Sequence, residues 1–439
     1  MVQLSFEEFS EQTIINPSGT LEKPAVSRAL GHVITPMEVV EFMVSLAEPT
    51  RSRECRVLEP GCGDARFLRA FAKKYGDQHR LVGIEINRDI AIQTRKLVQS
   101  NITIIEGDFL LWQFNEKFDF VIGNPPYGIV GDSSHYPIHL LNDRKENYKK
   151  VTNTWKGKYN IYGAFIEKGV RLLAPHGKLI FIVPTTWMIL DDFSLLRCFL
   201  SQQGRISVFY LGRVFSGVNV SAVVLLLEKD KTGIRLYDLR HTFSRSDNLR
   251  ISPSVEKTQY SGEIIRFETE DWLSFEQTGI PLSKVFNIYF AARSPEFRKK
   301  GIISTVPCSG YVPVLTGRNL RVGFVDYERC FSGWWMRPED APLMRWFYSI
   351  PHLVVGHTKG LRMVCAMDWK CYPWREEYHL IPRAGFTVDW NAVEKYLNSE
   401  IVQRYLSEVY LDISPHLTKT ILHRIPILED VIQPRQFHK

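Results

Sequence analysis

The sequence predicts a Rossmann-like α/β domain built on a seven-stranded, mostly parallel sheet, followed by a second domain of mixed α+β structure. Two observations predict the first domain. Short apolar runs alternate with helical patterns up to about residue 240, which is the order typical of a parallel sheet with helices on both faces. The loop Pro60-Gly61-Cys62-Gly63 joins the first apolar run to a helical pattern, as in nucleotide-binding turns. The rest of the chain alternates little, and 439 residues exceed one ordinary domain.

Three parts of the chain follow from this division. We expect an N-terminal extension over residues 1–30, a first domain over 31–240 and a second domain over 245–439. A charged stretch at 228–233 and a polar stretch at 240–247 mark the boundary. The second domain interleaves basic and aromatic residues, a combination that suits a polyanion with exposed bases. On composition alone, an ordinary mixed domain with a large core remains an alternative.

Composition indicates a globular protein of the reducing cytoplasm. Hydrophobic residues make up 44% of the chain and charged residues 23%, values typical of soluble proteins. No apolar run is long enough to span a bilayer, and the polar, acidic N-terminus predicts no secretory signal. The seven cysteines show no metal-ligand spacing, so we expect free thiols and no metal. A net charge of +7 permits a polyanionic partner without requiring one.

The elements of the first domain can be placed from apolar periodicity. Thr35 is expected to cap a helix that begins at Pro36 and ends near Pro49. Buried strands are predicted at 56–58, 79–86, 102–105, 118–122, 178–183, 206–211 and 221–227. Helices are predicted at 65–76, 89–99, 161–173 and 195–200, and residues 131–158 are predicted to be a long polar, basic loop.

Carboxylates follow the first three strands. Glu59 precedes the glycine loop of Gly61 and Gly63, Glu85 lies about 20 residues further, and Asp108 follows the third strand. Glu85 has the spacing at which a carboxylate meets ribose hydroxyls. Acidic groups around a site suit a cationic, hydroxyl-rich ligand better than a phosphate. S-adenosylmethionine has an ammonium, a sulfonium, a ribose and an adenine, so it is favoured over NAD. Asp108 could accept from the adenine amino group with Phe109 packing on its ring; a helix cap or turn is the alternative.

The fourth strand leads into Asn124-Pro125-Pro126-Tyr127. Two prolines end the strand and hold the loop rigid. The Asn124 side-chain carbonyl and the Pro125 backbone carbonyl are two acceptors that could hold an exocyclic amino group, and Tyr127 offers a face for a planar base. Phe215, in the loop between the last two strands, is a second aromatic near this position. A structural turn is the alternative for the loop, and a packing role is the alternative for Phe215.

Long motifs in both domains resemble the gamma-class DNA adenine-N6 methyltransferases. In the first domain they are TPMEVVEFMVSLAEP, VLEP, FLRAF, DFLLW, GNPPYGIVG, TWKGKYN and YGAF. In the second domain they are GEIIRFETE, FAARSPEF, VPVLTGRN, PHLVV, HTKG, YPWREE and PHLT. The resemblance covers nearly the whole length. It implies a methyltransferase catalytic domain followed by a DNA target-recognition domain.

The resemblance also implies roles for individual residues. The residues expected around S-adenosylmethionine are Thr35, Glu59, Gly61, Gly63, Glu85, Asp108, Phe109 and Pro126. The residues expected at the target adenine are Asn124, Pro125, Tyr127 and Phe215. The residues expected on DNA are Arg293, Arg298 and Arg318, with Pro415 helping to fill the space left by a flipped base. The chain departs from the family at PGCGDA and at residues 216–219, which puts the loop conformation and a phosphate contact in doubt.

The implied activity is methyl transfer from S-adenosylmethionine to adenine N6 of a flipped base in double-stranded DNA, by a monomer, without a metal. The implied site is a short palindrome such as TCGA, within or derived from a type II restriction-modification system. Whether a cognate restriction endonuclease accompanies the enzyme is left open. Two rival classes remain at this stage. RNA-base or protein-glutamine methyltransferases share the NPPY loop, and a non-enzymatic DNA-binding protein is the second rival.

Overall fold

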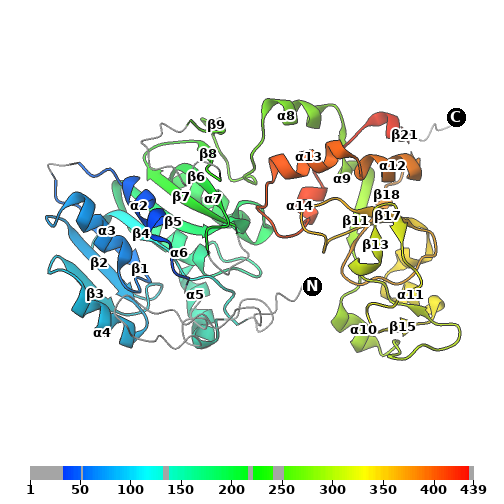
Figure 1. Ribbon diagram of the computed structural model, residues 1–439, viewed down its shortest axis with the longest axis horizontal. Helices are drawn as coiled ribbons and strands as arrows, with labels where there is room; N and C mark the ends of the chain where they lie inside the picture. The colour runs from blue at the N-terminus through cyan, green and yellow to red at the C-terminus, as the bar shows by residue number, and fades with distance from the viewer. Residues whose placement is uncertain (1–32, 51–52, 132–137, 216–220, 241–251, 435–439) are drawn as a thin grey trace. The chain divides into compact units, whose positions relative to one another are not determined.

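The computed structural model describes residues 33–50, 53–131, 138–215, 221–240 and 252–434. They form two compact units, the first ending at Ile265 and the second beginning at Arg266. The predicted N-terminal extension, residues 1–30, lies outside the described residues, as do residues 216–219. Figure 1 shows the elements of each unit.

The first unit is organised around one sheet with the strand order β3-β2-β1-β4-β5-β7-β6-β8-β9. Strands β1 to β5 pair in parallel, whereas β7 runs antiparallel between β5 and β6. The strands are β1 (Arg56–Pro60), β2 (Arg80–Glu85), β3 (Ile102–Glu106), β4 (Phe118–Gly123), β5 (Leu173–Pro184), β6 (Gly204–Gly212), β7 (Ala222–Lys229), β8 (Ile234–Asp238) and β9 (Val255–Lys257). All seven strands predicted from the sequence are confirmed.

The described sheet has two strands more than the seven predicted. β8 pairs in parallel with β6, from Ile206 opposite Ile234 onward, and β9 pairs antiparallel with β8. The sequence signal was weak because β8 alternates between buried and partly exposed residues and follows a charged turn. The sheet therefore continues through Lys257, past the polar stretch at 240–247 that suggested a domain boundary.

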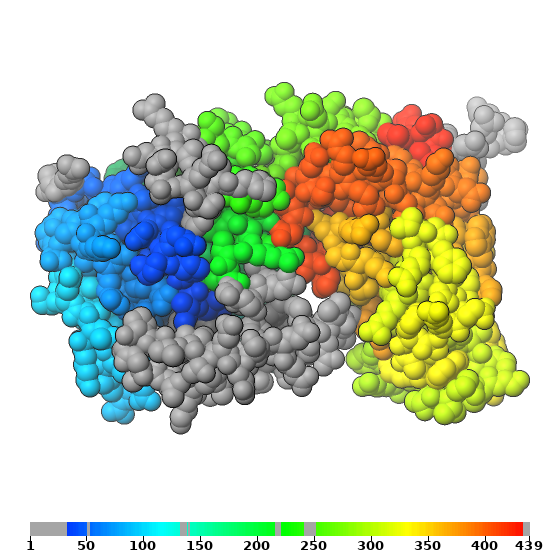
Figure 2. All heavy atoms as spheres, in the orientation of Figure 1, coloured from blue at the N-terminus to red at the C-terminus, as the bar shows by residue number. Residues whose placement is uncertain are grey.

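Helices cover both faces of the sheet. On one face, Val39 of α2 and Phe71 of α3 share a buried cluster with Ile122 of β4. On the other face, a Cβ at Gly169 of α6 would lie only 3.4 Å from Val121 of the same strand. The helices are α2 (Met37–Ser45), α3 (Arg66–Tyr75), α4 (Arg88–Leu97), α5 (Lys145–Val151), α6 (Tyr162–Arg171) and α7 (Ser194–Gln203). Figure 2 shows α2, in dark blue, at the surface of the first unit.

The second unit is a mixed α+β structure, as predicted. Its largest sheet is antiparallel, with the order β11-β18-β16-β17. The longer elements are α8 (Glu270–Gln277), β11 (Phe286–Phe290), α10 (Ser294–Lys300), β16 (His352–Val355), β17 (Cys365–Asp368), β18 (Tyr378–Pro382), α12 (Trp390–Leu397) and α13 (Glu400–Val409). The shorter helices are α9 (Leu282–Val285), α11 (Ala341–Met344) and α14 (Lys419–Leu422).

Short two-stranded ladders and 3-10 turns complete both units. The ladders of the second unit are β10 (Ile280–Pro281) with β20 (Pro426–Ile427), β12 (Val312–Pro313) with β15 (Trp335–Met336), β13 (Leu320–Arg321) with β14 (Phe324–Val325), and β19 (Phe386–Val388) with β21 (Ile432–Pro434). The 3-10 turns are η2 (His139–Arg144), η3 (Thr185–Met188), η4 (Asp191–Phe193), η5 (Gly317–Asn319), η6 (Pro338–Asp340), η7 (Trp346–Ser349) and η8 (Glu429–Val431). Every helix in the described ranges falls short of the length and apolar character that crossing a bilayer requires.

Candidate active site at the carboxyl ends of β1 to β4

The loop after β4 is fixed by backbone hydrogen bonds to a neighbouring segment. The Gly128 amide donates to Asn160 Oδ1 at 2.8 Å, and the Ile161 amide donates to the Gly128 carbonyl at 2.8 Å. Together with Pro125 and Pro126, these bonds hold the loop at the end of a buried strand. Parallel sheets place ligands at this edge.

The side-chain amide of Asn124 uses both hydrogens of Nδ2 as donors, whereas its acceptor Oδ1 has no partner among the described residues. Its Nδ2 donates to the Val33 carbonyl at 2.8 Å and to Thr35 Oγ1 at 3.0 Å. A backbone carbonyl can only accept, so the amide must turn Nδ2 toward Val33. Its Oδ1 is buried and has no hydrogen-bond partner among the described residues. An unpaired buried acceptor costs about 1–3 kcal/mol, which an incoming donor would recover.

Thr35 does not cap α2, contrary to the sequence-based expectation. Pro36 occupies the N-cap position, and no side chain caps this end of the helix. The Thr35 side chain is 2% exposed, and its hydroxyl faces the Asn124 amide instead. The hydroxyl accepts from Asn124 Nδ2 at 3.0 Å, a partner that the tertiary fold supplies and that the local sequence does not indicate. Thr35 therefore directly contacts the loop of residues 124–128, which is called the base loop from here on.

Tyr127 and Phe215 lie against each other. Their ring centroids are 6.1 Å apart with an interplanar angle of 62°. A base held between two ring faces needs about 7–8 Å, twice the usual carbon–carbon contact distance. The two rings are thus neighbours, as expected, but they would have to separate to admit a base. The Tyr127 hydroxyl donates to the Ile182 carbonyl at 3.0 Å, and burial raises its pKa well above the ordinary value.

The glycine loop uses its amides within the protein. The Gly61 and Cys62 amides donate to the Ile84 carbonyl, at 2.8 and 3.1 Å. The Gly63 amide donates to Glu85 Oε2 at 3.0 Å. Because these donors are engaged, the loop does not form the open nest of N–H groups that a phosphate requires. This arrangement agrees with a ligand that lacks phosphate.

Positive φ angles explain why the loop after β1 contains two glycines. Gly61 and Gly63 have φ values of 65° and 51°, where glycine is favoured. Ala65, near the position of the absent third glycine, also has a positive φ of 56° and is fully buried. A non-glycine residue in this conformation stores strain of about 1 kcal/mol, so the loop is held by its surroundings.

Two carboxylates converge on this loop. Glu59 is 2% exposed and accepts from the Leu68 amide of α3 at 3.1 Å, and burial raises its pKa well above the ordinary value. Glu85 is 6% exposed and also accepts from the Asn87 amide at 2.8 Å. A buried carboxylate with few donors favours a cationic or hydroxyl partner. Both residues could therefore bind an ammonium or a ribose.

Asp108 is held by two residues that sequence reasoning missed. Its Oδ2 accepts from the Tyr148 hydroxyl at 2.7 Å and from Arg144 at 2.8 Å, while Oδ1 accepts from the Leu110 amide. Arg144 ends η2 and Tyr148 lies in α5, within the stretch 131–158 that the sequence presented as a loop. The many lysines of this stretch left no apolar periodicity from which a helix could be predicted. The one signal within α5 itself was its single aromatic residue, Tyr148, among lysines and other polar residues.

Phe109 is 3% exposed and packs into the core, with its ring centroid 4.9 Å from that of Phe165. Phe165 also lies 3.8 Å from the Cβ position of Gly61, as does Pro126 Cδ. The structure thus brings Phe109, Gly61 and Pro126 to one aromatic cluster beside the glycine loop. No cluster of three or more His, Cys, Asp or Glu side chains among the described residues is suited to a metal ion.

Comparison with known proteins decides the family. Residues 38–214 match the Eco57I restriction-modification methylase family, and residues 312–427 match the TaqI-like C-terminal specificity domain. Type II methyltransferase M.TthHB8I of Thermus thermophilus is 50% identical over 411 residues, covering 93% of each chain. The chain belongs to the type II restriction-modification DNA methyltransferases. The resemblance noted in the sequence and the predicted methyltransferase fold are confirmed.

More distant relatives agree with this assignment. Modification methylase CviBIII of Paramecium bursaria Chlorella virus NC1A is 31% identical over 170 residues, covering 38% of this chain and 41% of the relative. A structure of the Type ISP restriction-modification enzyme LlaGI with a DNA substrate mimic has a TM-score of 0.54 at 14% identity, covering 91% of this chain and 53% of that chain. That likeness concerns the fold alone.

The second unit of this methyltransferase exposes all four residues predicted to meet DNA. The Arg293 guanidinium lies 5.6 Å from the Phe290 ring centroid, and that of Arg298 lies 5.6 Å from the Trp334 centroid. Arg318 is exposed in η5, and Pro415 is exposed between α13 and α14. Stacking on aromatic rings orients an arginine while leaving its donors available.

Proposed function

We propose that this methyltransferase transfers a methyl group from S-adenosylmethionine to adenine N6 in duplex DNA. The observation that carries the proposal is the buried, unpaired Oδ1 of Asn124, the residue that precedes Pro125 in the chain. An exocyclic amino group has two protons, and this Oδ1 and the Pro125 carbonyl supply two acceptors. The donor side of Asn124 is anchored to Val33 and Thr35, so the acceptor is already oriented.

The residues at the carboxyl ends of β1 and β2 fit S-adenosylmethionine. Glu59 and Glu85 offer buried carboxylates to an ammonium and to ribose hydroxyls, while the amides of the glycine loop are engaged elsewhere. Asp108 retains acceptor capacity beyond its three present bonds, because a carboxylate has about four lone-pair sites. When bound, S-adenosylmethionine supplies an electrophilic methyl group on its sulfonium.

The chain's own residues would act on the base by positioning and electrostatics. A target inside a duplex is unreachable, so it must be flipped out at a cost of a few kcal/mol. Tyr127 and Phe215 would offset part of this by stacking, at about 1–3 kcal/mol per base. Acceptance of both N6 protons by Asn124 Oδ1 and the Pro125 carbonyl would free the nitrogen lone pair from conjugation with the ring. Preorganised acceptors of this kind lower the barrier without rearranging.

The remaining details of the proposal rest on the family resemblance. They are a monomer acting in the cytoplasm on a short palindrome such as TCGA, with Arg293, Arg298, Arg318 and Pro415 on the DNA, and with an endonuclease, if one exists, acting separately. The specificity-domain match over residues 312–427 supports DNA reading by the second unit.

Labelled methyl transfer tests the proposal. Purified enzyme with methyl-labelled S-adenosylmethionine should label a TCGA duplex on N6 of adenine. A duplex already carrying N6-methyladenine at both sites, an RNA duplex and a glutamine peptide serve as matched acceptors that should stay unlabelled. Asn124→Ala should abolish the label while S-adenosylmethionine affinity stays nearly unchanged. Label on a cytosine amino group would contradict the adenine assignment, and label on RNA or peptide would contradict the substrate class.

A further inference from the structure

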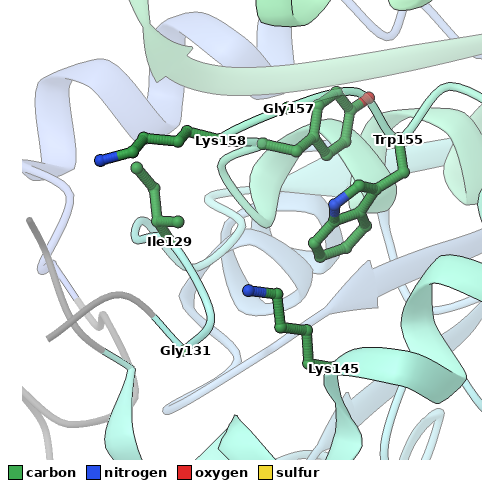
Figure 3. A pocket seen from close by; sticks show the side chains of 7 residues that line it. Ile129, Gly131, Lys145, Trp155, Gly157 and Lys158 are labelled. Atoms are coloured by element: carbon green, nitrogen blue, oxygen red, sulfur yellow. The ribbon is translucent and has the colours of Figure 1, made fainter.

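A basic pocket opens beside the base loop of the first unit. Its volume is about 240 Å³, and its lining among the described residues includes Ile129, Lys145, Trp155 and Lys158 and contains no acidic residue. Figure 3 shows the Lys145 side chain and the Trp155 indole at one space, while the Lys158 ammonium points away from the indole. None of these residues has a role in the site described above.

The pocket is rigidly connected to the loop that would hold the target base. Ile129 and Gly131 follow Tyr127 by two and four residues, a span of at most about 14 Å. The opposite wall includes Trp155, only a few residues before Asn160, which accepts from the Gly128 amide. The phosphates of one DNA strand recur about every 3.4 Å along the helix axis. This short connection makes a phosphate next to the flipped nucleotide the candidate ligand for the pocket.

Lys145 is positioned to present its ammonium to the pocket. It is the first residue of α5, and its side chain has no hydrogen bond or ion pair within the described residues. A Cβ added at Gly131 would lie 3.2 Å from Lys145 Nζ, so a glycine leaves room for the ammonium over the loop. Gly131 also has φ of 76°, and its amide donates to Asn142 Oδ1 at 2.9 Å. The loop and the lysine are fitted to each other.

Trp155 contributes a donor without a partner. Its indole Nε1 is buried and makes no hydrogen bond among the described residues. Figure 3 shows the indole edge that carries this nitrogen facing the space between the two lysines. Indole N–H is a donor only, so the group that satisfies it must be an acceptor. The ring is fixed by Tyr159, whose centroid lies 5.3 Å away.

Carboxylates near the pocket are turned to other partners. Asp192 accepts from the Lys158 backbone amide at 3.3 Å and lies beneath Gly157. Glu146, the next residue of α5, pairs with Lys149 at 2.7 Å. Among the described residues, the Lys145 ammonium and the Trp155 N–H therefore supply this space with a positive charge and a hydrogen-bond donor. An oxyanion fits this set, because lysine binds phosphate as a point charge.

We propose that this pocket binds one phosphodiester of the DNA strand that carries the target base, next to the flipped nucleotide. The proposal rests on the proposed DNA methylation and adds a contact from the catalytic unit. A single phosphodiester has one charge, which one lysine can neutralise, and oxygens that accept from the indole N–H. A free phosphate ion has the same chemistry, so the test must separate the two sources.

The salt dependence of duplex affinity measures the proposed contact between the pocket and the phosphodiester. Each neutralised phosphate contributes about 0.9 to the slope of log affinity against log salt concentration. Lys145→Met should therefore make this slope shallower by about 0.9, whereas Lys150→Met, the same change elsewhere on α5, should leave it unchanged. Trp155→Phe removes the N–H donor but keeps an aromatic ring and the charge of Lys145. It should therefore weaken binding severalfold while the slope stays at the wild-type value. Circular dichroism and S-adenosylmethionine affinity check that each variant is folded.

A second arm locates the phosphate and identifies its source. Duplexes with one neutral methylphosphonate beside the target adenosine should bind wild type more weakly but should bind Lys145→Met no worse than the unmodified duplex. Inorganic phosphate, titrated without DNA, should show no saturable binding at millimolar concentration. Unchanged slopes in Lys145→Met, or phosphate binding without any slope change, would overturn the proposal. Failure of the wild type to methylate any duplex would instead overturn the proposed function and would leave these slopes readable.

Discussion

At the scale of single residues, the central contact joins Thr35 to Asn124 across 89 positions of sequence. We predict that Thr35→Val, which keeps the shape and removes the hydroxyl, lowers kcat about two- to tenfold. One of two bonds that orient the Asn124 amide is lost, and a hydrogen bond contributes about 0.5–1.5 kcal/mol. Steady-state methylation and S-adenosylmethionine titration check this. Weakened cofactor affinity with an unchanged kcat would show that Thr35 acts on the cofactor alone.

The aromatic pair Tyr127 and Phe215 should stabilise the flipped base. Tyr127→Ala with Phe215→Ala should leave less of a 2-aminopurine target held out of the helix, because each stack contributes about 1–3 kcal/mol. Tyr127→Phe should keep most activity, since stacking needs a π face and the hydroxyl serves only the Ile182 carbonyl. Equal fluorescence and turnover in parent and double variant would make both residues packing groups.

The sequence singled out the loop residues to which we assign chemistry, but it did not predict how they are held. Asn124 and Tyr127 stand out locally because the proline pair isolates them at a strand end. Their supports, Val33, Thr35 and the Ile182 carbonyl, come from distant segments. Thr35 was even given a local capping role, because capping is the only function that a threonine before a proline suggests by itself. Contacts between distant segments of this kind cannot be predicted from apolar periodicity.

At the scale of elements, Asp108 links β3 to α5 through Arg144 and Tyr148. Asp108→Ala should loosen α5 and lower the free energy of unfolding by about 1–3 kcal/mol, because the 1%-exposed Tyr148 keeps a hydroxyl without its partner. Hydrogen–deuterium exchange of α5 checks this. Lys149→Ala, which breaks an exposed pair on the same helix, is the control and should change little. Unchanged exchange in Asp108→Ala would show that α5 is held by packing alone.

In the second unit, Glu377 joins segments from three of the family motifs. Its carboxylate accepts from the His357 amide and from the Thr358 hydroxyl, and its carbonyl accepts from the Ala291 amide at 2.8 Å. A Cβ at Gly317 of η5 would collide with Glu377 Oε1. The residue thus binds the 357–360 loop and packs closely against η5. Burial raises its pKa from 4.5 to about 7.

This raised pKa predicts a pH-dependent stability. The folded state binds the Glu377 proton more tightly than the unfolded state, so its contribution to stability is present below pH 4.5 and is lost as pH rises to about 7. Relative to Glu377→Gln, the wild type should lose on the order of 3 kcal/mol over this range. Urea unfolding of both proteins at several pH values measures the difference. A difference that does not vary with pH would contradict the prediction.

Element prediction succeeded where burial enforces a pattern. Strands β1 to β7 are mostly buried and rich in apolar residues because helices cover both faces of the sheet, and their positions could be predicted. α5 and β8 were missed because each is short, exposes much of its surface and follows charged residues. Their positions depend on partners such as Asp108 and β6, which lie far away in the sequence.

At the scale of the whole molecule, the two units match two different family models, a methylase over 38–214 and a specificity domain over 312–427. We therefore assign the proposed chemistry and the proposed sequence reading to separate parts of one chain. The 50% identity to a type II methyltransferase across 93% of both chains covers both parts at once. In the proposed function, the second unit selects the target site, and the unpaired Asn124 Oδ1 of the first unit then holds the selected base.

One measurement tests this central claim most directly. DNA from a bacterial host without adenine methylation, expressing either the wild type or Asn124→Ala, should be sequenced for modified bases. The account predicts N6-methyladenine on both strands of one short palindrome, TCGA, with the wild type and none with the variant. Methylation on cytosine, or equal adenine methylation by the variant, would contradict the role given to Asn124.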